Sequence, residues 1–309
     1  MFGYARHPLT EARPPVTRDI MSDLTPALHH GAAIGLDHVG IVGADLEALA
    51  RAFFGLGFHL TPRATHASGR TANRCVMLRD GGYLELMATV PGKSSVTLDR
   101  FLARGPGAHI LAMEVDDEVA ALDRLRRAGI TTEVSLTERA ADQQGVKVRF
   151  ALVLPPDPPE GRMLLIRHLT RDLLWRPDNV EHPNHAVALA EVVYASDTPA
   201  ETMTRLSRLA GRPAEPDPLG GYRIPLVRGM LRILPHAAAA MLFPGASGGG
   251  PLSGLTIAVE PSNDTTVRAS GETRPAHTSG TIAQATGDIP AGLASNAGGV
   301  AIRFISVPG

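Results

Sequence analysis

Residues 35–47 read GLDHVGIVGADLE, and this stretch decides how the chain folds. Its first half is a short apolar segment whose alternation is typical of a β-strand, in which His38 lies on the face opposite Val39 and Ile41. Asp45 then predicts the N-cap of a helix, because a short carboxylate accepts hydrogen bonds from the first free backbone N–H groups. Apolar residues at helical spacing follow, so the stretch predicts a strand that leads directly into a helix.

The same strand–helix unit returns along the chain. From Asp45 to the capping Gly57 is 57 − 45 = 12 positions, and from Asp117 to Gly129 is 129 − 117 = 12 positions. The first strands of the later copies are expected at 110–115, 187–194 and 254–259, and the helix of the fourth copy is poorly specified. Repeated units of this kind predict a fold built from copies of one module.

Three further strands are expected after the first helix, at 58–63, 73–78 and 82–88. The sequence Asp-Gly-Gly at 80–82 predicts the hairpin turn between the last two. Each module is therefore strand, helix, strand, strand, strand (βαβββ), and the fold class is α+β.

Composition excludes several classes of function. The 309 residues carry 30 basic and 31 acidic side chains, a formal net charge of −1, which favours neither nucleic acid nor a membrane surface as partner. No apolar run reaches transmembrane length. The single cysteine, Cys75, lies in an apolar strand pattern and suits a reducing cytoplasm.

Three segments carry a resemblance to a known family: LDHV at 36–39, TANR at 71–74 and GYLEL at 82–86. With them, the chain resembles the glyoxalase-like branch of the vicinal oxygen chelate superfamily over most of 34–170, and more weakly to its end. The segments HLT, WRP and HPN within 168–184 match the run that links two halves in such proteins. The resemblance implies βαβββ modules paired into half-barrel sheets in two domains.

The expected organisation has four parts. Residues 1–33 form an N-terminal extension within which Met21 is an alternative start, 34–170 the first glyoxalase-like domain, 171–185 a connector, and 186–309 a second such domain with a degenerate last module.

In this superfamily paired modules curve around a divalent metal, and the ligands come from the first and last strands of each module. His38 and Glu85 match those positions in the first module, and strand alternation places Glu85 on one face with Tyr83 and Met87. An imidazole and a carboxylate suit iron, manganese, zinc or nickel. The alternative is that His38 and Glu85 hydrogen-bond each other as a buried pair.

The second module departs from the family pattern. Counting back from the helix caps places Ile110 opposite His38, since 117 − 7 = 110 and 45 − 7 = 38. His109 lies one residue away and needs a β-bulge to reach the same face. On the closing strand Leu165 lies four residues after Gly161, as Glu85 lies four residues after Gly81, and His168 follows three residues later. His109 and His168 are therefore the candidates for a third metal ligand.

Thr71, Asn73 and Arg74 are substrate-orienting candidates by resemblance, or else a hairpin-entry network. The predicted function is a metal-dependent lyase, isomerase or dioxygenase that acts on a small oxygenated organic substrate, with Glu85 also moving a proton. The alternative is a metal-free protein that binds or sequesters a small molecule. A homodimer through the second domain is compatible with either function.

Overall fold

The computed structural model describes residues 30–140, 147–246, 248–261 and 294–307. The strands of the first two repeats are β1 (Gly35–Val42), β2 (Ala64–Thr65), β3 (Thr71–Met77), β4 (Tyr83–Thr89), β5 (Gly107–Glu114), β6 (Glu133–Ala140), β7 (Lys147–Leu154) and β8 (Arg162–His168). The later strands are β9 (Ala186–Ala195), β10 (Glu215–Pro216), β11 (Tyr222–Pro225), β12 (Met230–Leu234), β13 (Leu252–Val259), β14 (Ala294–Ala297) and β15 (Val300–Ser306). The helices are α1 (Leu46–Gly55), α2 (Val96–Leu102), α3 (Glu118–Arg127), α4 (Pro177–Val180), α5 (Pro199–Ala210) and α6 (His236–Leu242), with a 3₁₀ turn at Arg171–Leu173.

One strand order recurs four times. The first strand of each repeat pairs in parallel with the last, which gives the orders β1-β4-β3-β2, β5-β8-β7-β6, β9-β12-β11-β10 and β13-β15-β14. Helices α1, α3 and α5 follow the first strand of their repeats, as the sequence predicts. The predicted α+β class is confirmed, and the expected degenerate helix of the fourth repeat falls at 262–293, outside the described residues.

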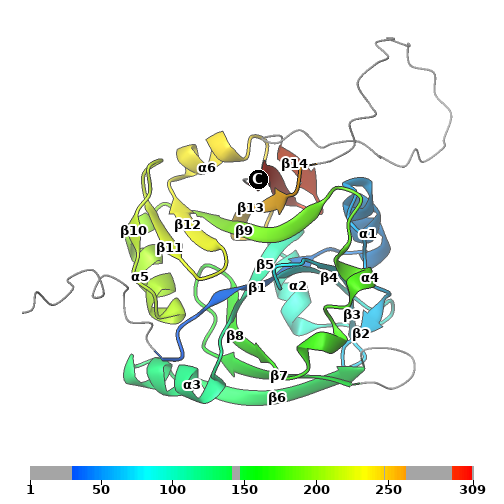
Figure 1. The fold of residues 1–309 in the computed structure, drawn as a ribbon, viewed down its shortest axis with the longest axis horizontal. Coiled ribbons are helices and arrows are strands. Elements are labelled where there is room, and N and C mark those ends of the chain that lie inside the picture. The colour runs from blue at the N-terminus through cyan, green and yellow to red at the C-terminus, as the bar shows by residue number, and fades with distance from the viewer. Residues whose placement is uncertain (1–29, 141–146, 247, 262–293, 308–309) are drawn as a thin grey trace, which may run out of the picture.

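The repeats join through their first strands. β1 pairs antiparallel with β5, and β9 pairs antiparallel with β13. One bridge between Leu252 and Ala108 connects the two pairs, so the strands form one continuous sheet path (Figure 1). A second link is the β11–β12 turn, where Arg228 bridges to Gly35 at the start of β1. The boundaries proposed for two domains stay a prediction.

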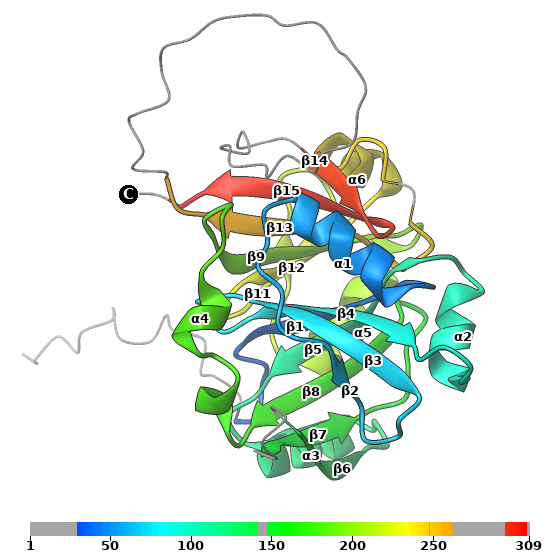
Figure 2. The same cartoon turned by 90° about the vertical axis from the view of Figure 1, so that its right-hand side faces the viewer.

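The helices bury one face against the convex side of the sheet. The side chain of Asp45 accepts hydrogen bonds from the backbone N–H groups of the first turn of α1, and Asp117 does the same for α3. Phe53 of α1 is fully buried, and burial of such a side chain contributes about 2–3 kcal/mol. Figure 2 shows α1 between the strands of the first repeat and β13–β15 of the fourth, where Leu49 packs against Gly298. The helix therefore contributes to a core shared by both pairs of repeats.

Two β-bulges interrupt the β1–β5 pairing. Leu36 pairs with Met113 while His38 pairs with Ala112, so Asp37 is the extra residue in β1. The second bulge lies in β5 at His109, because the partners of Gly40 and Ile41 skip that residue. The two extra residues are equivalent by the offset of the helix caps, since 117 − 45 = 72 and 109 − 37 = 72.

One strand prediction is wrong. Residues 58–63 carry no strand, and the short β2 begins at Ala64 instead. The backbone N–H of Thr61 still donates to the carbonyl of Cys75, but Pro62 removes the next donor. The ladder with β3 therefore starts only after this proline.

Candidate functional site

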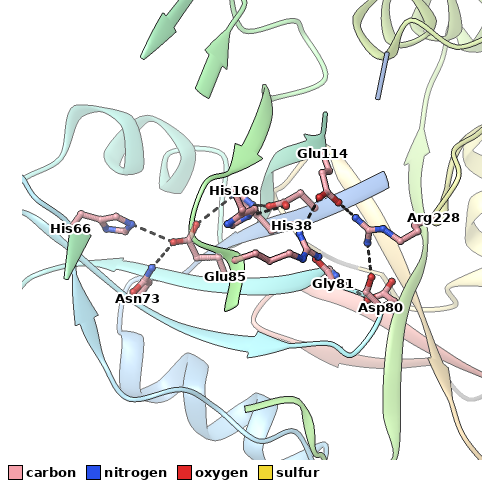
Figure 3. Close-up of polar contacts among 12 residues, drawn as sticks. His38, His66, Asn73, Asp80, Gly81, Glu85, Glu114, His168 and Arg228 are labelled. Atoms are coloured by element: carbon pink, nitrogen blue, oxygen red, sulfur yellow. Dashed lines mark hydrogen bonds and ion pairs between the residues drawn. The ribbon is translucent and has the colours of Figure 1, made fainter. Parts of the chain in front are cut away.

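Asp37 binds two histidines, His38 and His168, both of which are labelled in Figure 3. Its carboxylate accepts a hydrogen bond from Nδ1 of His38 at 2.6 Å and another from Nε2 of His168 at 3.0 Å. The bulge explains this geometry, because an extra residue turns the Asp37 side chain toward the face of His38 rather than the opposite face. Asp37 is 0% exposed and His38 is 6% exposed.

The two histidines keep Asp37 ionised. Burial alone raises the pKa of this carboxyl, but the charges and hydrogen bonds of His168 and His38 outweigh burial and hold the pKa well below its usual range. A buried carboxylate on Nδ1 fixes the orientation of the His38 ring. Nε2 of His38 is thereby turned toward Glu85, and it lies 3.8 Å from Oε2 of that residue.

Glu85 on β4 is held from the other side. The amide of Asn73 donates to its Oε1 at 2.5 Å, and Nε2 of His66 lies 3.3 Å from the same oxygen. His66 is itself bound through Nδ1 to the hydroxyl of Thr71 at 2.8 Å. Burial raises the pKa of Glu85, but His66, His38 and Asn73 together lower it to about 2. Glu85 is therefore a fixed negative charge at neutral pH.

Aromatic rings cover the histidines. The ring of Tyr83 stacks on His38 with centroids 4.5 Å apart, and the ring of Trp175 meets His168 edge-on at 4.8 Å. Trp175 donates to the carbonyl of Leu78 at 3.0 Å, and the Arg171 guanidinium lies 4.0 Å from its ring. The tryptophan thus packs over the concave face of the first pair of repeats.

A second polar network holds the segment that carries Trp175. Glu114, at the end of β5, accepts a hydrogen bond from Arg171 at 3.0 Å. It also pairs with Arg228 from the β11–β12 turn (Figure 3). Arg171 also donates to the carbonyl of Gly81 at 2.9 Å, where a Cβ atom would collide with the guanidinium. These contacts fix the connector that carries Trp175 against the turn before β4.

The second repeat presents apolar side chains where the first presents polar ones. Glu85 lies beside Gly40, two residues after His38, and Leu164 lies beside Ala112, two residues after Ile110. Ile110 and Leu164 are therefore the counterparts of His38 and Glu85. Both belong to an apolar cluster with Phe101 of α2. The predicted counterpart Leu165 instead faces the main core on the helix side.

Of the three predicted substrate-orienting residues, the structure brings two to the site and directs the third away from it. Thr71 and Asn73 contact the residues around Glu85, whereas Arg74 points to the other face and pairs with Glu47 at 3.2 Å. Arg74 is thus not brought to this site.

The two candidates for a third metal ligand are also placed apart. The bulge that His109 needs is present, but the ring stacks on Phe101 and Nε2 bonds the carbonyl of Gly105 at 2.9 Å. His168 reaches the site through Asp37, with Nε2 occupied by that bond. Neither is therefore placed to complete a ligand set with His38 and Glu85.

The donor set does not complete a metal site. Among residues 30–140, 147–246, 248–261 and 294–307, no three histidine, cysteine, aspartate or glutamate side chains are grouped so that they could hold an ion. His38 and Glu85 supply two donors, His66 approaches the other oxygen of Glu85, and the second repeat adds only Ile110 and Leu164. The residues present therefore do not fit the metal that the resemblance implies.

Sequence reasoning missed Asp37 and His66. Strict strand alternation places Asp37 with Val39 and Ile41 on the face opposite His38, and only the bulge reverses that. His66 stands alone in the loop before β3, and neither its neighbours nor its spacing signalled a role. The one signal that could have pointed to Asp37 was its place directly before His38 in the LDHV segment that carries the family resemblance.

The concave face of the later repeats has a different polar cluster. Glu191 accepts from the hydroxyl of Thr256 at 2.7 Å and pairs with Arg303 at 3.1 Å and Arg232 at 3.4 Å. Arg232 in turn binds Asp217 through two bonds of 2.8 Å. Two arginines thus face two carboxylates within the cluster, an arrangement that satisfies its own charges.

Comparison with known proteins identifies the family. The model of the glyoxalase-like domain family matches residues 36–210, which is more than half of the chain. The chain belongs to this family, and the predicted membership in the vicinal oxygen chelate superfamily is confirmed. No curated protein matches the chain.

Two solved structures, the first two described here, show the same fold at low identity. A hypothetical protein from Staphylococcus aureus has a TM-score of 0.61 and 13% identity, with 89% of this chain and 100% of that chain covered. A variant of 4-hydroxymandelate synthase from Streptomyces coelicolor has a TM-score of 0.50 and 16% identity, with 74% and 72% covered. A methylmalonyl-CoA epimerase from Mycobacterium tuberculosis is 29% identical over 44% of this chain and 89% of its own, with a TM-score of 0.35.

Proposed function

We propose that this protein is an enzyme that moves a proton on a small oxygenated organic substrate, with His38 as the base. The observation that carries the proposal is the bond of 2.6 Å between Asp37 and Nδ1 of His38, which leaves Nε2 directed toward Glu85. A buried carboxylate that orients an imidazole in this way is typical of general acid–base sites.

The proposed chemistry follows from where the charges lie. Because ionised Asp37 binds the Nδ1 proton, Nε2 of His38 is the nitrogen that accepts a proton from a carbon next to a carbonyl group or from a hydroxyl. The resulting imidazolium lies between Asp37 and Glu85, and both negative charges stabilise it. Return of the proton to a neighbouring carbon gives an isomerase reaction. A lyase reaction results instead when the electron pair left on carbon expels a leaving group from the adjacent carbon and the imidazolium gives its proton to that group.

Glu85 has a different role in this proposal from the one that the sequence predicted. With a pKa of about 2 it is too weak a base to remove a proton from carbon. Its contribution is the fixed charge that Asn73 holds in place at 2.5 Å. Since the donor set does not fit a divalent metal, the proposed proton transfer uses side chains alone, and the residues present do not support the dioxygenase alternative.

The test is hydrogen–deuterium exchange into candidate substrates. Wild-type protein in D₂O is incubated with a panel of α-hydroxy ketones, α-keto acids and 2-substituted 3-oxo acids, and exchange at carbon is followed by NMR. We expect His38→Ala to lose exchange by about a hundredfold or more. His236→Ala, which changes an exposed histidine on α6, serves as the control and should keep wild-type exchange. Exchange that survives in His38→Ala refutes the proposal.

Metal content is measured on the same samples. Stoichiometric zinc, iron, manganese or nickel that disappears from His38→Ala and Glu85→Ala would contradict the metal-free form of the proposal and support the metal-dependent one.

A metal-free binding protein is the second candidate, because Ile110 and Leu164 give half of the concave face an apolar surface. Saturable binding of a panel compound without exchange in any variant would favour it. A cytoplasmic location and a homodimer stay predictions, and in the described part of the chain no helix has the length and apolarity needed to cross a bilayer.

A further inference from the structure

A hollow outside the site is lined by two loops of the first repeat. Ser68, Gly69 and Arg70 precede β3, and Gly92, Lys93 and Ser94 follow β4. These six exposed residues line an open hollow of about 520 Å³. The two loops lie side by side, since the N–H of Val90 donates to the carbonyl of Arg70 at 2.8 Å.

Its chemistry is that of an anion site. Arg70 and Lys93 bring two positive charges, two serines bring hydroxyl groups, and no acidic residue is among the lining residues. In contrast to the paired arginines of the later repeats, neither Arg70 nor Lys93 forms an ion pair with any residue that the structure describes. Two unpaired cations beside hydroxyl groups attract a phosphate or carboxylate.

The glycines leave room for the ligand. Gly69 and Gly92 have φ angles of +67° and +76°, which other residues rarely adopt. No atom lies within 4 Å of the place where a Cβ atom would stand on either. The backbone at both positions is therefore open to an approaching group.

One of the loops that line the hollow also carries a residue of the proposed site. His66 begins the loop that ends in Arg70, and its ring reaches Glu85 at 3.3 Å (Figure 3). From Glu85 to Thr89 at the end of β4 is four residues, or about 13 Å along an extended strand. The end of β4 beside the hollow is thus about 13 Å from Glu85, so only an extended ligand could reach both.

We infer that this hollow binds a terminal phosphate or carboxylate of an extended substrate whose reacting carbon lies beside His38. The inference rests on the proposed function for the reacting end. Anion binding itself is measured without turnover, so the two can fail separately.

The test is a titration with inorganic phosphate, followed by backbone amide NMR at low ionic strength. We expect saturable shifts at Gly69 and Gly92, and a dissociation constant raised about tenfold or more in the double variant Arg70→Ala/Lys93→Ala. The matched control Arg51→Ala/Lys147→Ala removes one exposed arginine and one exposed lysine elsewhere and should bind as wild type. Unsaturated shifts, or equal weakening by the control, overturn the inference.

Two further arms identify the anion and separate the hypotheses. Sodium acetate replaces phosphate in a parallel titration: saturation by acetate with similar affinity assigns a carboxylate, and saturation by phosphate alone assigns a phosphate. His38→Ala should bind phosphate as wild type does. Loss of phosphate binding in His38→Ala would place the anion at the catalytic residues instead and overturn the separate site.

Discussion

Replacing Glu85 by glutamine tests whether its charge is as strongly stabilised as the contacts indicate. The change keeps the size of the side chain but removes the negative charge near His66 and His38. It also leaves a single acceptor oxygen for both Asn73 and His66, and it puts an amide N–H₂ donor in place of the oxygen near His38. The variant should therefore be less stable where Glu85 is ionised in the wild type.

The size of the effect follows from the pKa of Glu85, lowered from 4.5 to about 2. The difference, 4.5 − 2 = 2.5 units, corresponds to about 3 kcal/mol at 1.36 kcal/mol per unit. Because the folded-state pKa is depressed, this stability is present above the unfolded value of 4.5 and is lost as the pH falls toward 2. We expect the variant to lose about 3 kcal/mol at pH 5 and only about 1.4 kcal/mol at pH 3.

Urea denaturation of both proteins at pH 5, 4 and 3 measures the difference. Glu133→Gln changes an exposed glutamate on β6 and should stay within about 0.5 kcal/mol of wild type at each pH. A loss that is the same at pH 5 and pH 3 would show that packing rather than charge causes it. A loss near zero at pH 5 would refute the argument for a stabilised carboxylate.

Three more predictions follow from the geometry. Gly81→Ala should cost about 2 kcal/mol more than Gly129→Ala by thermal unfolding, because both residues have positive φ but only Gly81 has a side chain in the way. His109→Phe should lose less stability than wild type between pH 7 and 5. Burial lowers the pKa of His109, so the folded protein resists protonation and its stability falls as the pH drops below 6.5; an unchanged pH profile would contradict this. Asp37→Asn should reduce deuterium exchange about a hundredfold while phosphate binding is retained; exchange at the wild-type rate would show that the aspartate does not orient His38.

The repeats were predictable from sequence because their signals are local. An aspartate cap followed by a helical apolar stripe and a glycine needs no tertiary information, and Asp45 and Asp117 both cap as expected. Simple strand alternation also predicted that His38 and Glu85 lie on the same face of the sheet. In the structure Nε2 of His38 lies 3.8 Å from Oε2 of Glu85.

The rest of the site depends on tertiary structure. A β-bulge is a property of two paired strands, so the sequence of β1 alone could not show that Asp37 turns to the side of His38. His66 reaches Glu85 only because the β2–β3 hairpin folds over β4. Alignment by a preceding glycine chose Leu165, whereas the register with β5 chooses Leu164, since the two turns before the closing strands differ.

The two bonds of Asp37 have a consequence for how ligands enter. They tie the opening strand of one repeat to the closing strand of the next through a carboxylate that water does not reach. Moving these two repeats apart would leave the buried charge of Asp37 without its partners. A hinge motion between the repeats is therefore an unfavourable way to admit a ligand. Access should come instead from outward swings of the hairpin tip that carries His66, and exchange of amide hydrogens there should be faster than at the strand ends that Asp37 joins.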